Sequence, residues 1–380
     1  MDFDLSEEQQ LLQDSVTRLM ADRYDFERRN EYAKSAEGFS LPLWRQYAEL
    51  GVLGLLFDEA HGGIGDDGVG TMIVMQAFGR ALALEPYLAT VVLGGGVIRH
   101  GGSAQQKEAI LPKIADGTLR LAFAQAERQS RYNLADVKTT AKKAGGGWVL
   151  DGEKSLVLHG DSADMLIVVT RTSGAQRDEK GLSLFLVDAR AAGVSRRGYP
   201  TQDGRRAAEI AFAQVTVPEN ARIGDIGAAF PVIERVVDEA RAALCADAVG
   251  AMEAMHALTV EYLKTRKQFG AAIGSFQALQ HRAVDMFVAV EQARSMAMLA
   301  AMTARDEDAE ARRKSVAAAK VQIGRSGKFV GQQAVQLHGG VGMTMELKVG
   351  HYFKRVTMTD TLFGDADYHL ARLAEAGGLI

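Results

Sequence analysis

Two short stretches of the chain combine a cation or glycines with the end of a predicted helix, a pattern that can bind an anion. The first is Thr265-Arg266-Lys267-Gln268-Phe269-Gly270, and the second, about 70 residues later, is Gln336-Leu337-His338-Gly339-Gly340-Val341-Gly342. The Arg266 guanidinium can donate paired hydrogen bonds to phosphate oxygens. The missing side chains at Gly339 and Gly340 let backbone amides approach an anion closely. Each motif by itself has an ordinary explanation. The basic residues of the first can offset the dipole at the end of a helix, and the glycines of the second can simply end a helix. Their co-occurrence with Gln277, near the start of another predicted helix, favours a binding site.

The elements that must position these motifs come in the order helices, strands, helices. A capping box at Ser6-Glu7-Glu8-Gln9 predicts the first helix. Further helical patterns run over Leu41–Leu50, Gly68–Leu88 and Gln105–Ile114, with breaks expected at Gly62-Gly63 and Gly94-Gly95-Gly96. Short apolar runs bounded by turns predict strands at Leu121–Ala126, Trp148–Leu150, Met165–Val169, Leu182–Val187 and Ile210–Val217. Long helices return at Pro231–Lys267, Phe276–Arg305, Ala309–Leu337 and Ala366–Ala376.

This order predicts an α+β multidomain chain. We expect an N-terminal helical domain at residues 1–120, a central β domain, barrel-like or sandwich, at 121–225, and a C-terminal helical bundle at 226–380. With 380 residues, the chain exceeds the usual size of one hydrophobic core. The formal net charge of −4 gives no field of one sign that would attract nucleic acid or an anionic membrane.

Cysteine usage and the start of the chain predict a cytoplasmic protein. Cys245 is the only cysteine, so an intramolecular disulfide is impossible and a reducing compartment is expected. The start, Met1-Asp2-Phe3-Asp4, lacks the basic region and apolar core of a secretion signal, and we expect no membrane-spanning run of apolar residues. No His, Cys or Asp cluster has metal-ligand spacing, so no metal site is expected.

Over essentially its whole length the sequence resembles the acyl-CoA dehydrogenases, whose chains run from N-terminal helices through a β domain to a four-helix bundle. The most specific match is Tyr262 to Gly270, then Phe276-Gln277-Ala278, then Ala334 to Gly340. The resemblance implies that FAD is the cofactor. It also implies that the pyrophosphate and adenosine half of an FAD lying mostly in a neighbouring subunit is held by Arg266, Phe269, Gln277, Gln336, Gly339 and Gly340. It therefore implies an oligomer, with a tetramer as the expectation, an acyl-CoA substrate, and electron-transfer flavoprotein or a similar acceptor.

The segments that hold the flavin ring in this family read differently here. Ala122 to Asn133 corresponds to the family's Thr-Glu-Pro-Gly-x-Gly-Ser-Asp element, of which Glu127 survives while Ala126 replaces the hydroxyl residue. Lys154 to Gly160 corresponds to Lys-x-Trp-Ile-Thr-Asn-Gly, with Leu156 in place of the aromatic and Leu158 in place of the threonine near the reactive N5. Because leucine donates no hydrogen bond, side-chain recognition of the ring is lost at these points. Drift within a strand edge is the alternative explanation.

The resemblance also implies that a carboxylate just before the final helix acts as the catalytic base. In the segment Thr361 to Leu373, one register of the match places Asp365 at that position and another places Gly364 there. An N-terminal helix cap is the competing role for Asp365. Some relatives carry the base on the first bundle helix, where this chain has Ala240, and we interpret the neighbouring Glu239 as a surface charge. His256 and His281 are interpreted as ordinary helix residues.

The sequence thus predicts a FAD-dependent acyl-CoA dehydrogenase that acts in fatty acid degradation as one subunit of a two-chain assembly. The partner is expected to be a related acyl-CoA dehydrogenase subunit or the chain itself. The run Met1 to Gln13 loosely resembles the small subunit of pimeloyl-CoA dehydrogenases. One alternative is a non-catalytic partner that completes another chain's FAD site, and another is a flavin oxidase or monooxygenase on the same fold.

Overall fold

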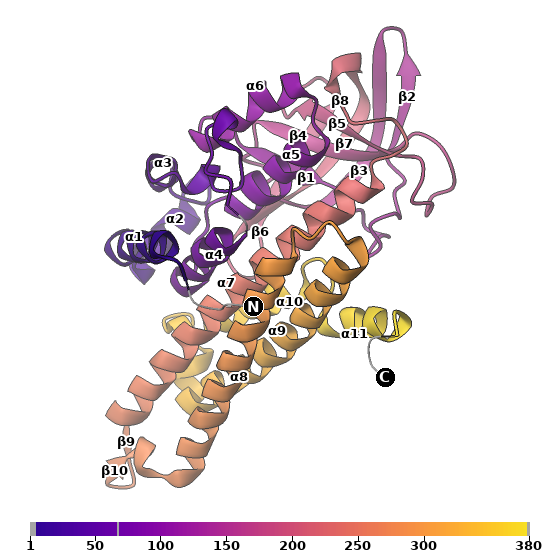
Figure 1. The fold of residues 1–380 in the computed structure, drawn as a ribbon. Coiled ribbons are helices and arrows are strands. Elements are labelled where there is room, and N and C mark those ends of the chain that lie inside the picture. The colour runs from indigo at the N-terminus through magenta and orange to yellow at the C-terminus, as the bar shows by residue number, and fades with distance from the viewer. Residues whose placement is uncertain (1–4, 67, 378–380) are drawn as a thin grey trace. The chain divides into compact units, whose positions relative to one another are not determined.

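The computed structural model describes residues 5–66 and 68–377. Of the run Met1 to Gln13, the first four residues therefore lie outside the described residues. The chain forms two compact units. One comprises residues up to Glu31, Asp67–Ala83 and Arg241 onward, and the other comprises Tyr32–Asp66 and Leu84–Ala240. The predicted mixture of helices and strands is present (Figure 1).

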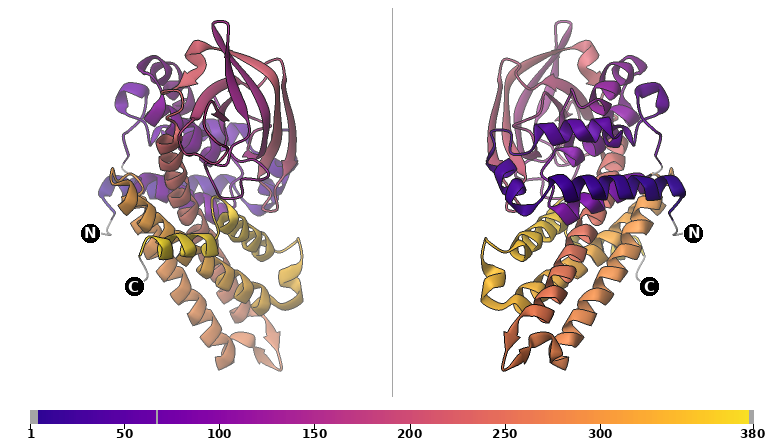
Figure 2. Two further views of the ribbon diagram at one scale, coloured as in Figure 1. Left: turned by 90° about the vertical axis from the view of Figure 1, so that its right-hand side faces the viewer. Right: turned by 90° about the vertical axis from the view of Figure 1, so that its left-hand side faces the viewer.

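The Tyr32–Ala240 unit contains a sheet whose strands lie in the order β6-β7-β3-β2-β4-β5-β8, with β1 paired to β4. Its strands curve around one another (Figure 2). Their bounds are β1 Leu121–Ala124, β2 Thr140–Ala144, β3 Gly147–Leu158, β4 Met165–Arg171, β5 Leu182–Asp188, β6 Val194–Pro200, β7 Arg206–Pro218 and β8 Arg222–Ile223. Leu150, Val168, Phe185 and Phe212 are buried in one cluster inside the sheet, and these apolar side chains form the core that the strands enclose.

The helices of the same unit are α3 Leu41–Glu49, α5 Gly96–Gly101 and α6 Ala104–Ala115, and α5 follows a π-helical segment at Leu88–Gly95. The expected break at Gly94-Gly95-Gly96 is wrong, because the helical backbone continues through it. A Cβ on Gly94 would lie 2.5 Å from the Cβ of Leu121, and one on Gly95 would lie 2.6 Å from the Phe57 ring. These glycines therefore allow close packing rather than ending a helix.

The other unit is helical, with α1 Glu7–Arg23, α4 Val69–Ala81, α8 Gln277–Thr303, α9 Ala309–His338, α10 Lys348–Thr361 and α11 Ala366–Glu375. It also contains α7 from Arg241 onward, whereas the whole helix runs from Phe230 to Thr265. The long helices α7, α8 and α9 lie side by side in both figures (Figures 1 and 2). Their core is built largely from small residues and methionines, such as Met252, Met255, Ala293, Ala297 and Ala319, which allows close helix packing.

Helix α4 crosses α7 at two glycines that no larger residue could replace. A Cβ on Gly79 would lie 1.8 Å from the carbonyl oxygen of Asp247, and one on Gly250 would lie 1.9 Å from that of Gln76. Helix α7 is also the one described helix long and apolar enough to cross a membrane by length and composition. Because 72% of its most apolar stretch is buried in the protein, its composition is that of a core helix.

Several elements differ from the sequence prediction. The Ser6–Gln9 capping box is confirmed at the start of α1, but strands β2 and β6 and the whole of α10 were not predicted. Half or more of the residues of β2 and β6 are exposed, so neither strand carries the continuous apolar run that marks a buried strand. Glu239, expected at the surface, is buried with 6% exposure.

Candidate functional site

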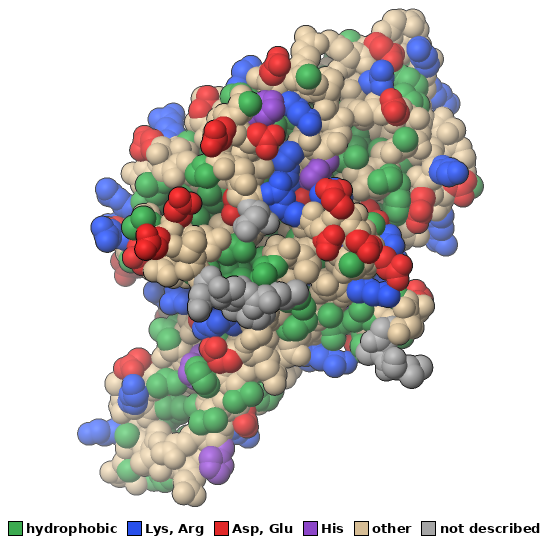
Figure 3. Space-filling model, in the orientation of Figure 1, with side chains coloured by type: hydrophobic (Ala, Val, Ile, Leu, Met, Phe, Trp, Pro, Cys, Tyr) green, Lys and Arg blue, Asp and Glu red, His purple; other side chains and the backbone are tan. Residues whose placement is uncertain are grey.

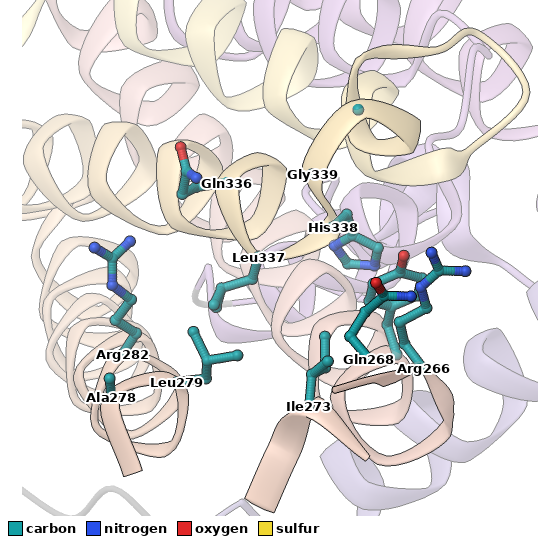
Figure 4. Close-up of a pocket in the computed structure, with 12 residues that line it drawn as sticks. Arg266, Gln268, Ile273, Ala278, Leu279, Arg282, Gln336, Leu337, His338 and Gly339 are labelled. Atoms are coloured by element: carbon teal, nitrogen blue, oxygen red, sulfur yellow. The ribbon is translucent and has the colours of Figure 1, made fainter. Parts of the chain in front are cut away.

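Both predicted anion-binding motifs line one pocket at the end of the helical bundle (Figure 4). The pocket has a volume of about 510 Å³ and is open to solvent on one side. It lies where α7 ends, α8 begins and α9 ends, so three helix termini and their unpaired backbone groups meet around it. Its lining residues are Tyr262, Arg266, Gln268, Ile273, Ala278, Leu279, Arg282, Gln336, Leu337, His338, Gly339 and Gly340.

The segment after α7 is a short hairpin that aims the first motif. Strands β9 Lys267–Gln268 and β10 Ala271–Ala272 pair antiparallel across Phe269 and Gly270, whose φ angles are +54° and +79°. Two successive positive φ angles are typical of the turn that best fits a two-residue hairpin. The left-handed conformation of Gly270 therefore serves the hairpin.

Two guanidinium groups face the pocket from opposite sides. Arg266 stands beside Gln268 on one side and Arg282 extends from α8 on the other (Figure 4). Arg282 Nη1 donates to Gln333 Oε1 at 3.3 Å, whereas the exposed Arg266 guanidinium has no hydrogen-bond or ion-pair partner within the described parts of the chain. Arg266 is thus available for an anionic ligand. Arg282 was not predicted, although it follows the predicted Gln277 on the same helix.

A buried histidine forms a flat, uncharged wall of the same pocket. The ring of His338 stacks on that of Tyr262, with centroids 4.4 Å apart and planes 28° apart. His338 Nδ1 donates to the Ala334 carbonyl at 2.8 Å. Burial lowers the pKa of His338 below its usual value, against the opposing effect of this hydrogen bond. Tyr262 precedes Arg266 by four residues, and this spacing, which puts both on one helix face, is the sequence signal that could have found it.

The second motif ends α9 with a backbone shape that requires glycine. Gly339 has φ +63° and ψ −147°, a combination essentially confined to glycine. Its amide donates to the Gln336 carbonyl, so this amide is already used within the protein. A Cβ at Gly339 or Gly340 would meet no atom within 4 Å, which leaves open space beside both backbones.

Two of the six predicted nucleotide-binding residues do not line the pocket. Gln277 is exposed at the start of α8, and Phe269 at the hairpin tip is 93% exposed. The Phe269 ring meets only Phe276 edge-on among the ring pairs of the described residues, with centroids 6.3 Å apart. The structure therefore brings together Arg266, Gln336, Gly339 and Gly340, while the other two lie outside.

The predicted ring-binding segment lies on strand β3 in the sheet unit. Ser155 donates its amide to the Ala126 carbonyl at 2.9 Å, and the pairing of β3 with β7 is irregular between Lys154 and Val157. At this irregularity Leu156 adopts φ +53° and is 39% exposed, whereas Leu158 is buried. The backbone here has the irregularity that often occurs next to binding sites, but Leu156 and Leu158 are apolar.

A buried ion pair supports this segment from behind. Lys154 Nζ donates to Glu127 Oε1 at 2.7 Å and to the Gln125 carbonyl at 3.1 Å. The amides of Lys138 and Thr139 donate to the same Glu127 carboxylate at 2.8 and 3.0 Å. Burial alone would raise the pKa of Glu127, but the charge and hydrogen bond of Lys154 and the other donors lower it to about 2. Glu127, the residue that survives from the family element, is therefore a structural anchor of the strand edge.

The predicted base lies in a tight turn between α10 and α11. Asp365 is the N-cap of α11, and its Oδ1 accepts the Tyr368 amide at 2.8 Å. Phe363 and Gly364 before it have φ angles of +56° and +110°. The capping role proposed as the alternative for Asp365 is therefore present, and one carboxylate oxygen is engaged in it.

Glu239 has partners that explain its burial. His100 Nε2 lies 2.8 Å from Glu239 Oε1, and Arg99 forms an ion pair with the other carboxylate oxygen. The interpretation of Glu239 as a surface charge is therefore wrong. The partners lie about 140 residues earlier in the chain, beyond the reach of any local pattern.

The sequence matches three family models that together span most of the chain. They are described as acyl-CoA dehydrogenase N-terminal domain, at residues 6–118, middle domain, at 122–216, and C-terminal domain, at 228–378. The chain belongs to the acyl-CoA dehydrogenase family. The predicted family, fold class, FAD cofactor and enzyme class of this family are confirmed.

Similar proteins extend over the whole chain. A probable acyl-CoA dehydrogenase, YngJ from Bacillus subtilis, is 28% identical over 391 residues and covers 100% of both chains. Among solved structures, the ChsE4-ChsE5 complex from Mycobacterium tuberculosis has a chain that is 26% identical with a TM-score of 0.89, and the FAD complex of PigA is 26% identical with a TM-score of 0.91. Both solved chains are covered completely, as is this one.

The pocket of this acyl-CoA dehydrogenase family member fits the nucleotide half of FAD by its donor set. A diphosphate needs cationic or amide donors, which Arg266 and Arg282 supply, and an adenosine needs flat surfaces. The Tyr262–His338 stack provides such a surface, and because the imidazole is uncharged it does not compete with the arginines for the phosphates. The pocket volume is in the range of small-ligand sites.

Proposed function

We propose that this chain is a FAD-dependent acyl-CoA dehydrogenase subunit that grips the nucleotide half of FAD and works beside a related chain. The observation that carries the proposal is the contrast between two segments. The bundle-end pocket presents an unengaged guanidinium, Arg266, whereas the strand edge expected to hold the flavin ring presents the apolar, partly exposed Leu156. A subunit built in this way contributes more to the diphosphate than to the ring.

Exposed apolar side chains on the bundle support an assembly of more than one chain. Val284, Phe287 and Val288 on α8 are each about half exposed, and hydrophobic side chains gather over this helix in Figure 3. Because their spacing puts them on one face of α8, they form a patch of the kind that marks a protein interface. The ChsE4-ChsE5 structure is named as a complex of two chains, which supports a two-chain arrangement here. A tetramer, as expected from the sequence, is part of the proposal.

The chemistry proposed for the assembly is α,β-dehydrogenation of an acyl-CoA thioester. When bound, FAD supplies the acceptor for the substrate's β hydrogen. In this chain the Asp365 carboxylate is the proposed base that takes the α proton, which requires it to lie within hydrogen-bond reach of that carbon. Electron-transfer flavoprotein or a similar protein is the proposed electron acceptor, and the cytoplasm the proposed location.

A non-catalytic role is the second candidate, and the Asp365 geometry favours it. One oxygen of the carboxylate already accepts the Tyr368 amide at 2.8 Å. In the other register of the family match, Gly364 stands at the base position and this chain has no base there. In that case the chain would complete the FAD site of a related subunit that performs the chemistry.

Asp365→Asn separates the two roles, because asparagine caps a helix about as well as aspartate but cannot take a proton. The assay is anaerobic bleaching of the flavin absorbance in the FAD-loaded assembly, with butyryl-CoA, octanoyl-CoA and glutaryl-CoA as probes. Loss of a positioned base should slow bleaching by about 100- to 10,000-fold while flavin content and Tm stay near wild type. Asp367→Asn, an exposed carboxylate in the first turn of the same helix, is the matched control. Bleaching within a few-fold of wild type in Asp365→Asn would assign the chemistry to a partner chain.

A further inference from the structure

An ammonium group is buried against the end of α10. Lys320 on α9 is 1% exposed, and its Nζ donates to the carbonyls of Thr359, Asp360 and Leu362 at 2.6, 3.0 and 3.1 Å. Three donors thus meet three acceptors. The last four carbonyls of a helix have no partner within the helix, so Lys320 satisfies the end of α10 from a neighbouring helix.

The next carbonyl is held from two further elements. Phe363 O accepts a hydrogen bond from Arg241 Nε of α7 at 2.9 Å and from His369 Nε2 of α11 at 3.2 Å. Directly after these contacts the backbone passes through the positive φ angles of Phe363 and Gly364. A Cβ on Gly364 would lie 2.5 Å from His369 Nε2, so the turn is closely packed as well as strained.

Helix α9 approaches the same turn at a second point. Gly324 lies one helical turn after Lys320, and a Cβ there would lie 2.1 Å from Asp360 Oδ1. This same Asp360 oxygen accepts the Ala366 amide at 3.1 Å. The side of α9 that carries Lys320 and Gly324 therefore fixes both the end of α10 and the start of α11.

Packing alone does not explain a charged side chain at this place. Burial lowers the pKa of Lys320 to about 8, with Cys245, Asp360 and Asp365 opposing the shift and Arg241 adding to it. An apolar side chain of similar volume would fill the site without the cost of desolvating an ammonium. The ammonium adds directional hydrogen bonds, which fix the positions of three carbonyl oxygens around one nitrogen.

We propose that Lys320 is a positioning residue that holds the Leu362–Asp365 turn so that the Asp365 carboxylate is presented to the acyl-CoA in one geometry. The inference rests on the proposed role of Asp365 as the base. Lys320 itself touches neither substrate nor cofactor in this scheme. It acts through the backbone of the turn.

The test compares Lys320→Gln with Arg355→Gln in the FAD-loaded assembly. Arg355 is an equally buried cation on α10, and its guanidinium pairs with Asp247 on α7 at 2.8 and 2.7 Å. Hydrogen exchange of the amides of residues 361–366 should quicken by about tenfold or more in Lys320→Gln, the effect of a lost charge-assisted hydrogen bond. The bleaching rate at saturating acyl-CoA should fall by about 100-fold, the cost of about 1 Å of misplacement, with little change in the half-saturating concentration. Arg355→Gln should lower Tm without either effect.

The wild-type chain provides a second measurement if Lys320→Gln does not fold. Of the groups around the ammonium, Cys245 has its pKa raised by burial to about 12 and His369 has its pKa lowered by burial to about 2, so neither titrates near pH 8. Arg241 and the carboxyl groups of Asp360 and Asp365 also lie near the ammonium, and burial raises the pKa of Asp360. After correction for intrinsic exchange, protection of residues 361–366 should therefore drop between pH 7 and pH 9, while amides in the interior of α10 keep theirs.

The outcomes separate this inference from the proposed function. Unchanged exchange of the turn in Lys320→Gln, or a flat pH profile in wild type, overturns the inference wherever the base lies. If Asp365→Asn slows bleaching, then lost protection of the turn in Lys320→Gln together with an unchanged bleaching rate in that variant overturns the positioning role. If Asp365→Asn also bleaches normally, the proposed base fails, and lost protection still supports the hold of Lys320 on the turn.

Discussion

Replacing Arg266 with alanine should weaken binding of the nucleotide half of FAD by a predictable amount. The guanidinium faces the pocket and has no hydrogen-bond or ion-pair partner in the described parts of the chain, so its loss costs no contact within the protein. Hydrogen bonds to charged groups contribute about 1.5 to 3 kcal/mol, which corresponds to an increase of about 10- to 150-fold in Kd. Binding should not vanish, because Arg282 remains on the opposite side of the pocket.

The assay uses ADP, which carries the diphosphate and adenosine of FAD without its ring. Isothermal titration of ADP into the flavin-free protein should show the weakened binding in Arg266→Ala, whereas FMN, which carries the ring half, should bind equally to both proteins. Lys267→Ala is the matched control, because it removes the same charge from the adjacent residue, which is exposed and does not line the pocket. It should change the Kd of ADP less than threefold, as expected for a screened surface charge.

Ionic strength gives an independent check on the same reasoning. Attraction between exposed charges weakens as the Debye length shortens from about 10 Å at 0.1 M salt to about 3 Å at 1 M. ADP affinity should therefore fall more steeply with salt in wild type than in Arg266→Ala. Equal losses of affinity in Arg266→Ala and Lys267→Ala would refute a specific diphosphate contact and leave only a diffuse positive field.

Three further predictions concern the sheet and the turn. Burial raises the pKa of Glu127, but Lys154 and the other donors lower it overall to about 2. The ionised carboxylate therefore stabilises the fold above the unfolded pKa of 4.5, and Tm should fall as the pH drops from 4.5 toward 2. Glu127→Gln should flatten that fall in Tm and destabilise the chain by about 3 to 5 kcal/mol in urea unfolding at pH 7, because it leaves the Lys154 ammonium buried without its partner. Leu156→Trp should raise flavin content, measured as the ratio of flavin to protein absorbance, because it places an aromatic at a partly exposed position that the sequence predicts to face the ring. No gain would argue that this edge does not meet the ring. Gly364→Ala should lower Tm by several degrees, since its Cβ would lie 2.5 Å from His369 Nε2, and an unchanged Tm would show that the turn is free to move.

The sequence predicted the motifs of the pocket better than their surroundings. Arg266 and Gly339 could be found because helix ends carry local signals in residue type, such as a basic last turn or a glycine. Arg282 and the stacking of His338 on Tyr262 could not be predicted, because they depend on which helix ends meet. That meeting is set by the packing of α7, α8 and α9 around alanines and methionines, which have no local signature of register.

Helix α10 shows a second kind of limit. Val349, Tyr352 and Val356 recur at helical spacing and are buried, so a periodic signal was present. It is weakened by Gly350 and by threonines near the C-terminal end, which have low helix propensity. The structure compensates with long-range partners: Arg355 pairs with Asp247, and Lys320 satisfies the final carbonyls. Such tertiary contacts stabilise a helix whose intrinsic helix propensity alone is too low to predict it.

Each of three segments singled out by the motifs contains a non-glycine residue with a positive φ angle. Phe269 in the hairpin, Phe363 before α11 and Leu156 in the β3 irregularity are three of the seven described non-glycine residues with positive φ. Such a residue persists only where its neighbours hold it, and strain of this kind concentrates at functional sites. The neighbours differ in each case: the β9–β10 pairing holds Phe269, Arg241 and His369 hold the carbonyl of Phe363, and the bond from Ser155 to Ala126 holds the strand beside Leu156. Because these contacts lie entirely within the protein, the three segments are shaped before any ligand binds, which lowers the entropy that binding must overcome.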